Sequence, residues 1–190
     1  MNEQQRWLLL IYKVPQDPPG RRTYVWRQLK QLGAVYLQQA AAILPDRPEV
    51  QAALDALATH IRSTEGEVSL LATTSPNADW EQELIARFNQ ARDEEYAEVV
   101  ENVERFEAEL QRESQKGKFT FAELEDSEID WEKIERWLPR IEARDFFLAP
   151  GRAGVLEALA RGRAGLEQFA AAVYQQQGVQ DNNNRSSDTL

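Results

Sequence analysis

The sequence contains no cysteine and a single histidine, His60. Without cysteine the chain cannot form disulfides, thiolate metal sites or thiol nucleophiles. One histidine cannot supply a zinc or iron site built from several histidines. No apolar run reaches the roughly 18 residues that a membrane helix requires. The N-terminus, MNEQQR, lacks the apolar stretch of a secretory signal, so we expect a cytoplasmic protein without membrane association.

The established catalytic sequence motifs are missing as well. The chain has no nucleophile elbow, no zinc-protease helix, no P-loop and no dinucleotide fingerprint. Carboxylates are too numerous for any one pair to stand out as a general acid and base. We therefore expect no enzymatic activity, no catalytic residue, no metal site and no cofactor.

The charge of the chain is unevenly distributed. The formal net charge is −10, yet Lys and Arg outnumber Asp and Glu in residues 1–46, whereas the acids predominate in residues 76–117. A strongly acidic chain repels nucleic acid as a whole. We therefore expect any polyanion or oxyanion to bind to the N-terminal part.

The N-terminal part begins with the sharpest structural signal in the chain. Residues 7–14, WLLLIYKV, form a short apolar and aromatic run, which is typical of a strand covered on both faces. The proline-rich segment 15–20 ends that strand. A helix is predicted to begin at Arg21 and to end before Gly33, a natural residue for the position after a helix.

The next elements complete a small sheet. Residues 34–37 and 40–44 predict two short strands, and a helix follows for which Asp46 is the expected N-cap, with Pro48 in its first turn. Residues 68–72 predict a fourth strand. The order strand, helix, strand, strand, helix, strand is that of a ferredoxin-like split βαβ sheet with both helices on one face, and we place this domain at residues 5–75.

The second half of the chain has a helical period throughout. From residue 77 the apolar residues predict one helix of roughly 35 residues, followed by a helix that Pro139 bends or splits. A last helix, or a pair of helices, is predicted around Gly162 and Gly165. The fold class is therefore α+β, with the sheet domain followed by a small α-helical bundle at 77–177 and a disordered tail at 178–190.

The first predicted helix carries the strongest candidate binding site, which consists of Arg21, Arg22, Trp26, Arg27 and Lys30. Free backbone N–H groups and the helix dipole favour anions at the start of a helix, so a DNA phosphate or an oxyanion could bind here. The alternative is that these cations only solvate an exposed helix face and pair with the acidic second half.

Other candidates have simpler explanations. Glu94, Glu98 and Glu101 recur at helical spacing and could form a row of oxygen ligands, but they more simply form a solvated acidic face. The segment 151–154, GRAG, could cradle a phosphate, but no strand leads into it, and a turn with helix caps is the simpler account. His60 flanks an apolar stripe and is interpreted as a boundary residue.

Several phrases of the sequence together suggest a family. They are WLLLIYKVP, PPGRRTYVWRQLKQLGAVYL, RDEEYAEVVENV and ARDFFLAPGRAGVLEAL. In this order they resemble the N-terminal region of the chromate-resistance regulator ChrB, over residues 7–175. The resemblance implies a bacterial cytoplasmic protein connected with a transcriptional response to chromate. Longer members of that family carry a further C-terminal domain associated with chromate sensing or resistance.

These observations lead to one principal hypothesis and two alternatives. The principal one is a non-enzymatic ChrB-like regulatory protein, a homodimer that binds promoter DNA or an oxyanion such as chromate through the basic aromatic helix. The first alternative is a module for protein–protein interaction or dimerisation. The second is a metal-dependent nuclease of ferredoxin-like fold, which Asp17, just after the first strand, suggests.

Overall fold

The computed structural model describes residues 4–15 and 20–187, with side chains described up to residue 178. Most of the predicted proline-rich turn, with Asp17, lies outside the described residues. The chain divides into two compact units. Unit 1 comprises Met1–Arg92 and Ala143–Ala149, and unit 2 comprises Asp93–Glu142 and Pro150–Leu190. Within the described residues, no helix combines the length and the apolar character that crossing a membrane requires.

Unit 1 is built on an antiparallel sheet. Its strands are β1 (Arg6–Lys13), β2 (Val35–Gln38), β3 (Ala41–Pro45) and β4 (Glu67–Thr74), and its first helices are α1 (Arg21–Gln31) and α2 (Pro48–Ser63). Within the described residues the four strands lie in the order β2-β3-β1-β4, and every neighbouring pair is antiparallel. The chain thus follows the predicted split βαβ order, with β1 between β3 and β4.

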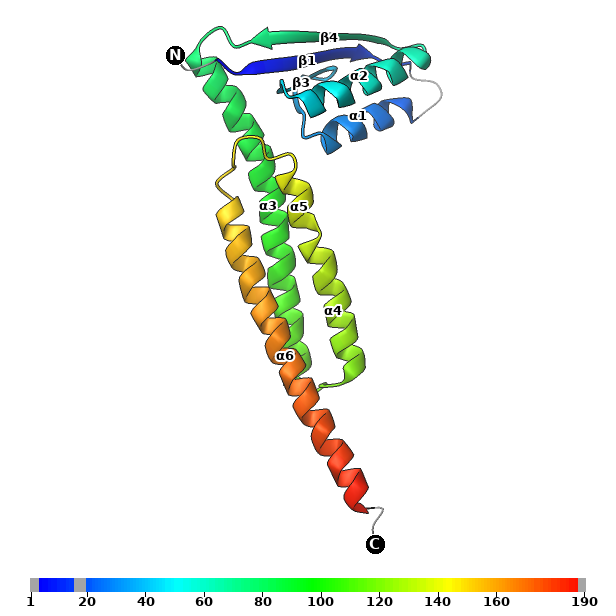
Figure 1. Ribbon diagram of the computed structural model, residues 1–190, viewed down its shortest axis with the longest axis vertical. Helices are drawn as coiled ribbons and strands as arrows, with labels where there is room; N and C mark the ends of the chain where they lie inside the picture. Colours follow the sequence, from blue (N-terminus) through cyan, green and yellow to red (C-terminus); the bar gives the residue numbers. More distant parts are fainter. Residues whose placement is uncertain (1–3, 16–19, 188–190) are drawn as a thin grey trace. The chain divides into compact units, whose positions relative to one another are not determined.

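One face of the sheet is covered by α1 and α2 (Figure 1). Side chains alternate along a strand, so Leu8 and Leu10 of β1 point to the same face. They pack in one core with Leu29 of α1 and Leu54 of α2, and Leu10, Leu29 and Leu54 are 0 % exposed. Burial of this apolar face holds both helices against the strands.

Around the start of β1 the opposite face of the sheet is covered by aromatic side chains of unit 1, whereas Leu71 of β4 on the same face is 50 % exposed. Trp7 of β1 is fully buried and stacks on Phe88, with 5.6 Å between the ring centroids. Phe88 belongs to the first part of α3 (Ala78–Gln115). The ring of Phe147, in the segment 143–149, lies 5.5 Å from the Phe88 ring, measured between centroids. The start of β1 is therefore buried on both faces, as its apolar run predicted. Further along the strand that prediction is wrong for the second face, because Ile11 is 43 % exposed.

The ends of the two helices test the expected caps. Gly33 has a positive φ of 79°, and its N–H donates to the carbonyl of Lys30 at 3.0 Å, which confirms it as the residue after α1. Asp46, however, is not the N-cap of α2. Arg47 takes that position without a side-chain cap, because the Asp46 carboxylate pairs with Arg6 at 3.1 Å.

Unit 2 is helical. It contains α3 from Asp93 onward, α4 (Phe121–Glu135), α5 (Trp137–Glu142) and α6 (Arg152–Ser187). Pro139 separates α4 from α5, because it lacks the N–H that would bond to the carbonyl of Glu135. Gly162 does not interrupt α6. A Cβ atom there would lie 2.4 Å from the Trp131 ring, so glycine permits the close packing of α6 on α4.

The predicted α+β class, a small antiparallel sheet followed by a long helical region, is confirmed. The compact units divide inside α3, whereas the sequence placed its domains at 5–75 and 77–177, and those two ranges as independently folding domains stay a prediction. Helix α6 continues through Gly178 to Ser187, where an irregular tail was expected. Disorder of residues 178–190 also stays a prediction.

The first core can be tested by truncating one side chain. Leu54→Ala should lower the free energy of unfolding by about 2–5 kcal/mol, because Leu54 is fully buried and its loss leaves a cavity. Leu71→Ala is the control, since Leu71 is 50 % exposed and should change stability by only about 0.5 kcal/mol. Urea unfolding followed by circular dichroism measures both. Equal losses would contradict the assigned core.

Candidate anion-binding site

A cavity of about 700 Å³ lies in unit 1 beside α1. Its lining comes from the end of β1, from α1, from β2 and from the turn between β2 and β3. The polar and aromatic residues that line it include Tyr12, Arg22, Trp26, Tyr36, Gln38 and Gln39. Within the described residues its lining includes no Asp or Glu, although the chain as a whole is strongly acidic. An anion in this cavity would therefore meet no carboxylate from the described part of the wall, while Asp17 lies outside the described residues.

The structure brings two of the five predicted site residues into this cavity. Arg22 and Trp26 both line it, four residues apart along α1. Lys30 is one turn further and places its Nζ atom 5.3 Å from the centroid of the Trp26 ring, a cation–π contact. Arg27 lies on the exposed face of α1. Arg22, Trp26 and Lys30 thus form a continuous stripe along one edge of the helix.

Arg21 makes a structural contact, and its predicted role in binding stays a prediction. Its Nη1 atom donates a hydrogen bond of 2.8 Å to the backbone carbonyl of Thr64, directly after α2. The guanidinium therefore ties the start of α1 to the end of α2. Arg22 and Arg27 are both exposed, and among the described residues no carboxylate pairs with either of them.

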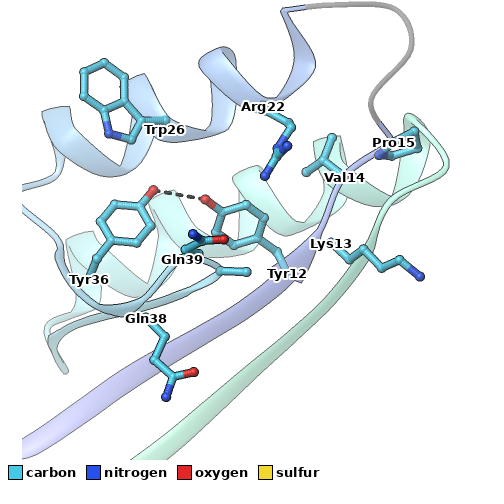
Figure 2. Close-up of a pocket in the computed structure, with 10 residues that line it drawn as sticks. Tyr12, Lys13, Val14, Pro15, Arg22, Trp26, Tyr36, Gln38 and Gln39 are labelled. Carbon is cyan, nitrogen blue, oxygen red and sulfur yellow. Dashed lines mark hydrogen bonds between the residues drawn. The ribbon is translucent and has the colours of Figure 1, made fainter.

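Two tyrosines form the floor of the cavity. The hydroxyl oxygens of Tyr12 and Tyr36 lie 3.1 Å apart, within hydrogen-bond distance. Figure 2 shows these hydroxyls facing each other, with the amide of Gln39 beside them and Arg22 extending from α1 toward them. Because one hydroxyl donates to the other, the pair keeps one O–H that can donate to a ligand.

Tyr36 keeps its proton at ordinary pH, because its pKa is raised. Burial raises the pKa of Tyr36 well above its usual value of 10.0, and the hydrogen bond to Tyr12 raises the pKa further. Burial disfavours the charged phenolate, so the neutral hydroxyl persists. A neutral hydroxyl donates to an anion without adding negative charge to the cavity.

Strand β2 is held in place by contacts that do not involve its side chains. Arg87 of α3 donates from Nη2 to the backbone carbonyl of Tyr36 at 2.6 Å. On the other side, the backbone N–H of Tyr12 donates to the carbonyl of Ala40 at 3.0 Å. These bonds fix both tyrosines from the backbone and leave their hydroxyls directed at the cavity.

The start of α1 adds to the positive character of the site. Gly20 is the N-cap and no side chain caps the helix, nor does the first turn contain an acid. The first backbone N–H groups of a helix have no partner within the helix and carry a partial positive charge. In α1 this charge lies beside the cation of Arg22, and the first turn itself contributes no carboxylate.

The other sequence candidates are accounted for by local contacts. Glu98 and Glu101 are exposed on α3. In the part of the chain that the structure describes, no group of three or more His, Cys, Asp or Glu side chains could hold a metal ion. At the start of α6, the N–H of Gly151 donates to Asp93 at 2.7 Å and Arg152 pairs with Glu142 at 2.6 Å. Carboxylates therefore already bind the segment 151–154, the one that could have cradled a phosphate.

His60 also has a structural partner. Its ring lies 4.4 Å from the ring of Tyr24, between centroids, so it joins the last turn of α2 to α1. This contact agrees with its interpretation as a boundary residue.

Comparison with known proteins identifies the family. The family model described as "Protein ChrB, N-terminal" matches residues 22–180, which is most of the chain and includes α1 and the cavity residues from Arg22 onward. The chain belongs to the ChrB N-terminal family. A curated relative, Protein ChrB of Cupriavidus metallidurans, is 38 % identical over 92 residues, which cover 48 % of this chain and 28 % of that protein. No solved structure matches the chain.

Four site residues of this ChrB N-terminal chain were missed by sequence reasoning. They are Tyr12, Tyr36, Gln38 and Gln39. Alternation along residues 7–14 places Tyr12 on the face of Leu8 and Leu10, which is a usable signal. The sequence does not show that Tyr36 lies beside Tyr12, because the pairing of β2 with β3 shifts register between Tyr36 and Gln38.

The tyrosine floor predicts a loss of stability at high pH. A raised folded-state pKa means that Tyr36 contributes stability that is present below its unfolded pKa, about 10, and is lost as pH rises through the folded value. The free energy of unfolding, measured by urea titration, should therefore fall above about pH 10 more steeply than in Tyr36→Phe. Identical pH dependence in the two proteins would refute the shifted pKa.

Proposed function

We propose that this chain is a non-enzymatic regulatory protein of chromate or oxyanion stress, which binds DNA or an oxyanion through the basic, aromatic face of α1. The link to chromate comes from its membership of the ChrB N-terminal family together with the resemblance described above. The binding role is supported chiefly by one observation. Arg22 and Trp26 of α1 line a cavity whose lining, as far as the structure describes it, contains no carboxylate.

The chemistry of the cavity suits an anion. A phosphate or chromate oxygen accepts hydrogen bonds and cannot donate them when ionised, so it needs donors around it. Arg22 supplies N–H donors with a permanent charge, and the tyrosine pair supplies one O–H. Arg27 and Lys30 extend the positive surface along the exposed side of α1. The same face can therefore attract either a DNA backbone or a small oxyanion.

Dimerisation is part of this proposal. Within the described residues β4 pairs only with β1, so its outer edge can pair with a second copy. A two-fold dimer would present two α1 helices, which suits a palindromic DNA site. A role purely as an interaction module stays an alternative prediction. The nuclease alternative depended on Asp17, which lies outside the described residues.

The proposal is tested by measuring binding to a labelled DNA duplex from the region upstream of the gene, by fluorescence anisotropy at several salt concentrations. The parent protein should bind at low salt and lose affinity steeply as salt rises, because bound phosphates release counterions. The double variant Arg22→Gln/Arg27→Gln should bind more weakly, and its slope of log affinity against log salt should be smaller by about two.

A matched control and a second ligand complete the design. The double variant Arg136→Gln/Arg140→Gln removes the same two positive charges from the exposed surface of unit 2 and should leave binding unchanged. Calorimetric titration with chromate, and with sulfate as a tetrahedral anion of equal charge, tests the oxyanion. If neither the duplex at low salt nor chromate binds, the proposed function is wrong.

A further inference from the structure

The cavity is much larger than an inorganic oxyanion requires. Its volume of about 700 Å³ falls inside the range of about 300–1,000 Å³ that is typical of sites for organic ligands. A tetrahedral oxyanion at Arg22 would fill a small part of this space. The remainder has a defined lining of aromatic, apolar and amide groups, so it can accept a larger group attached to the anion.

One wall of the cavity is a half-exposed aromatic ring. Trp26 lines the cavity and is 47 % exposed, whereas Trp7 in the same unit is fully buried. The ring lies within reach of two cations, because Lys30 contacts it and Arg22 is one helical turn away. An exposed indole flanked by cations is the arrangement on which nucleobases stack while their phosphates bind the cations.

The floor of the cavity offers both donors and acceptors. The Tyr12–Tyr36 pair keeps one free O–H and the lone pairs of its oxygens, and the Gln38 and Gln39 amides each carry an N–H₂ group and a carbonyl. An inorganic oxyanion uses only the donors. The edge of a nucleobase presents donors and acceptors side by side, so it uses both kinds of group.

The positive side chains of α1 lie where they can bind a phosphate at the mouth of the cavity. Arg22 lines the cavity, whereas Arg27 and Lys30 lie on the exposed side of the same helix. In the part of the chain that the structure describes, no lining residue is an acid that would repel a phosphate. A ring against Trp26 and a phosphate at Arg22 would therefore occupy adjoining parts of one site.

We propose that this cavity binds a nucleotide unit, with the base against Trp26 and the tyrosine floor and the phosphate at Arg22. The unit is either a free mononucleotide or an unpaired nucleotide of a single-stranded nucleic acid. The inference rests on the proposed function, because it uses the same α1 face, and it specifies which anion that face accepts. Double-stranded DNA keeps its bases stacked and cannot place one in the cavity.

The test is a titration of the full chain with a thymidine mononucleotide, a short single-stranded thymidine oligonucleotide and a duplex of equal length, at one low salt concentration. Trp26→Ala should weaken binding of the oligonucleotide by about tenfold or more, since stacking of a base is lost. Trp26→Phe should restore part of the affinity, because it retains an aromatic face. Trp80→Ala is the matched control, as Trp80 is 55 % exposed and does not line the cavity.

The outcomes distinguish a free nucleotide from single-stranded nucleic acid as the ligand. They also distinguish failure of the nucleotide inference from failure of the proposed function. Binding of the mononucleotide with the same dependence on Trp26 identifies a free nucleotide as the ligand, whereas binding of the oligonucleotide alone identifies single-stranded nucleic acid. Binding of only the duplex or chromate, or oligonucleotide binding that Trp26→Ala leaves unchanged, overturns the nucleotide inference and leaves the proposed function standing. Failure of every anion to bind overturns both. Circular dichroism of Trp26→Ala and of Trp26→Phe checks that both variants are folded.

Discussion

Burial of the start of β1 on both faces is the constraint on which unit 1 depends. Leu8 and Leu10 bind the strand to α1 and α2, while Trp7 packs on Phe88 on the other side. A strand whose two faces are both covered is typical of the interior of a sheet, and β1 has β3 and β4 as its neighbours. The same burial fixes where β1 ends. Tyr12 and the start of α1 are thereby brought to one end of the sheet, where the cavity forms.

The site depends on keeping carboxylates away from α1. The chain is strongly acidic, yet no acid lies between residues 18 and 45, and the described part of the cavity wall contains none. In unit 2 the opposite holds, because Arg152 pairs with Glu142 and the start of α6 receives Asp93. An arginine that is already paired with a carboxylate has little left to offer an anion. The two units therefore differ in chemistry as well as in fold.

Much of the architecture could be predicted from sequence because it follows local patterns. The apolar run of β1, the glycine after α1 and the helical period from residue 77 each specify an element without reference to the rest of the chain. Asp46 was misplaced because its ion pair with Arg6 joins residues 40 positions apart. The tyrosine floor was missed for the same reason. Its two hydroxyls meet across three strands, and no local pattern contains that register.

The central claim is that the anion binds between α1 and the Tyr12–Tyr36 pair. Nuclear magnetic resonance of the chain labelled with nitrogen-15 at tryptophan tests it directly, because each indole N–H gives its own signal. As the thymidine oligonucleotide or chromate is added, the account predicts that the signal of Trp26 shifts while that of Trp131, buried in unit 2, stays in place. A shift of Trp137 or Trp80 with Trp26 unmoved would contradict the account.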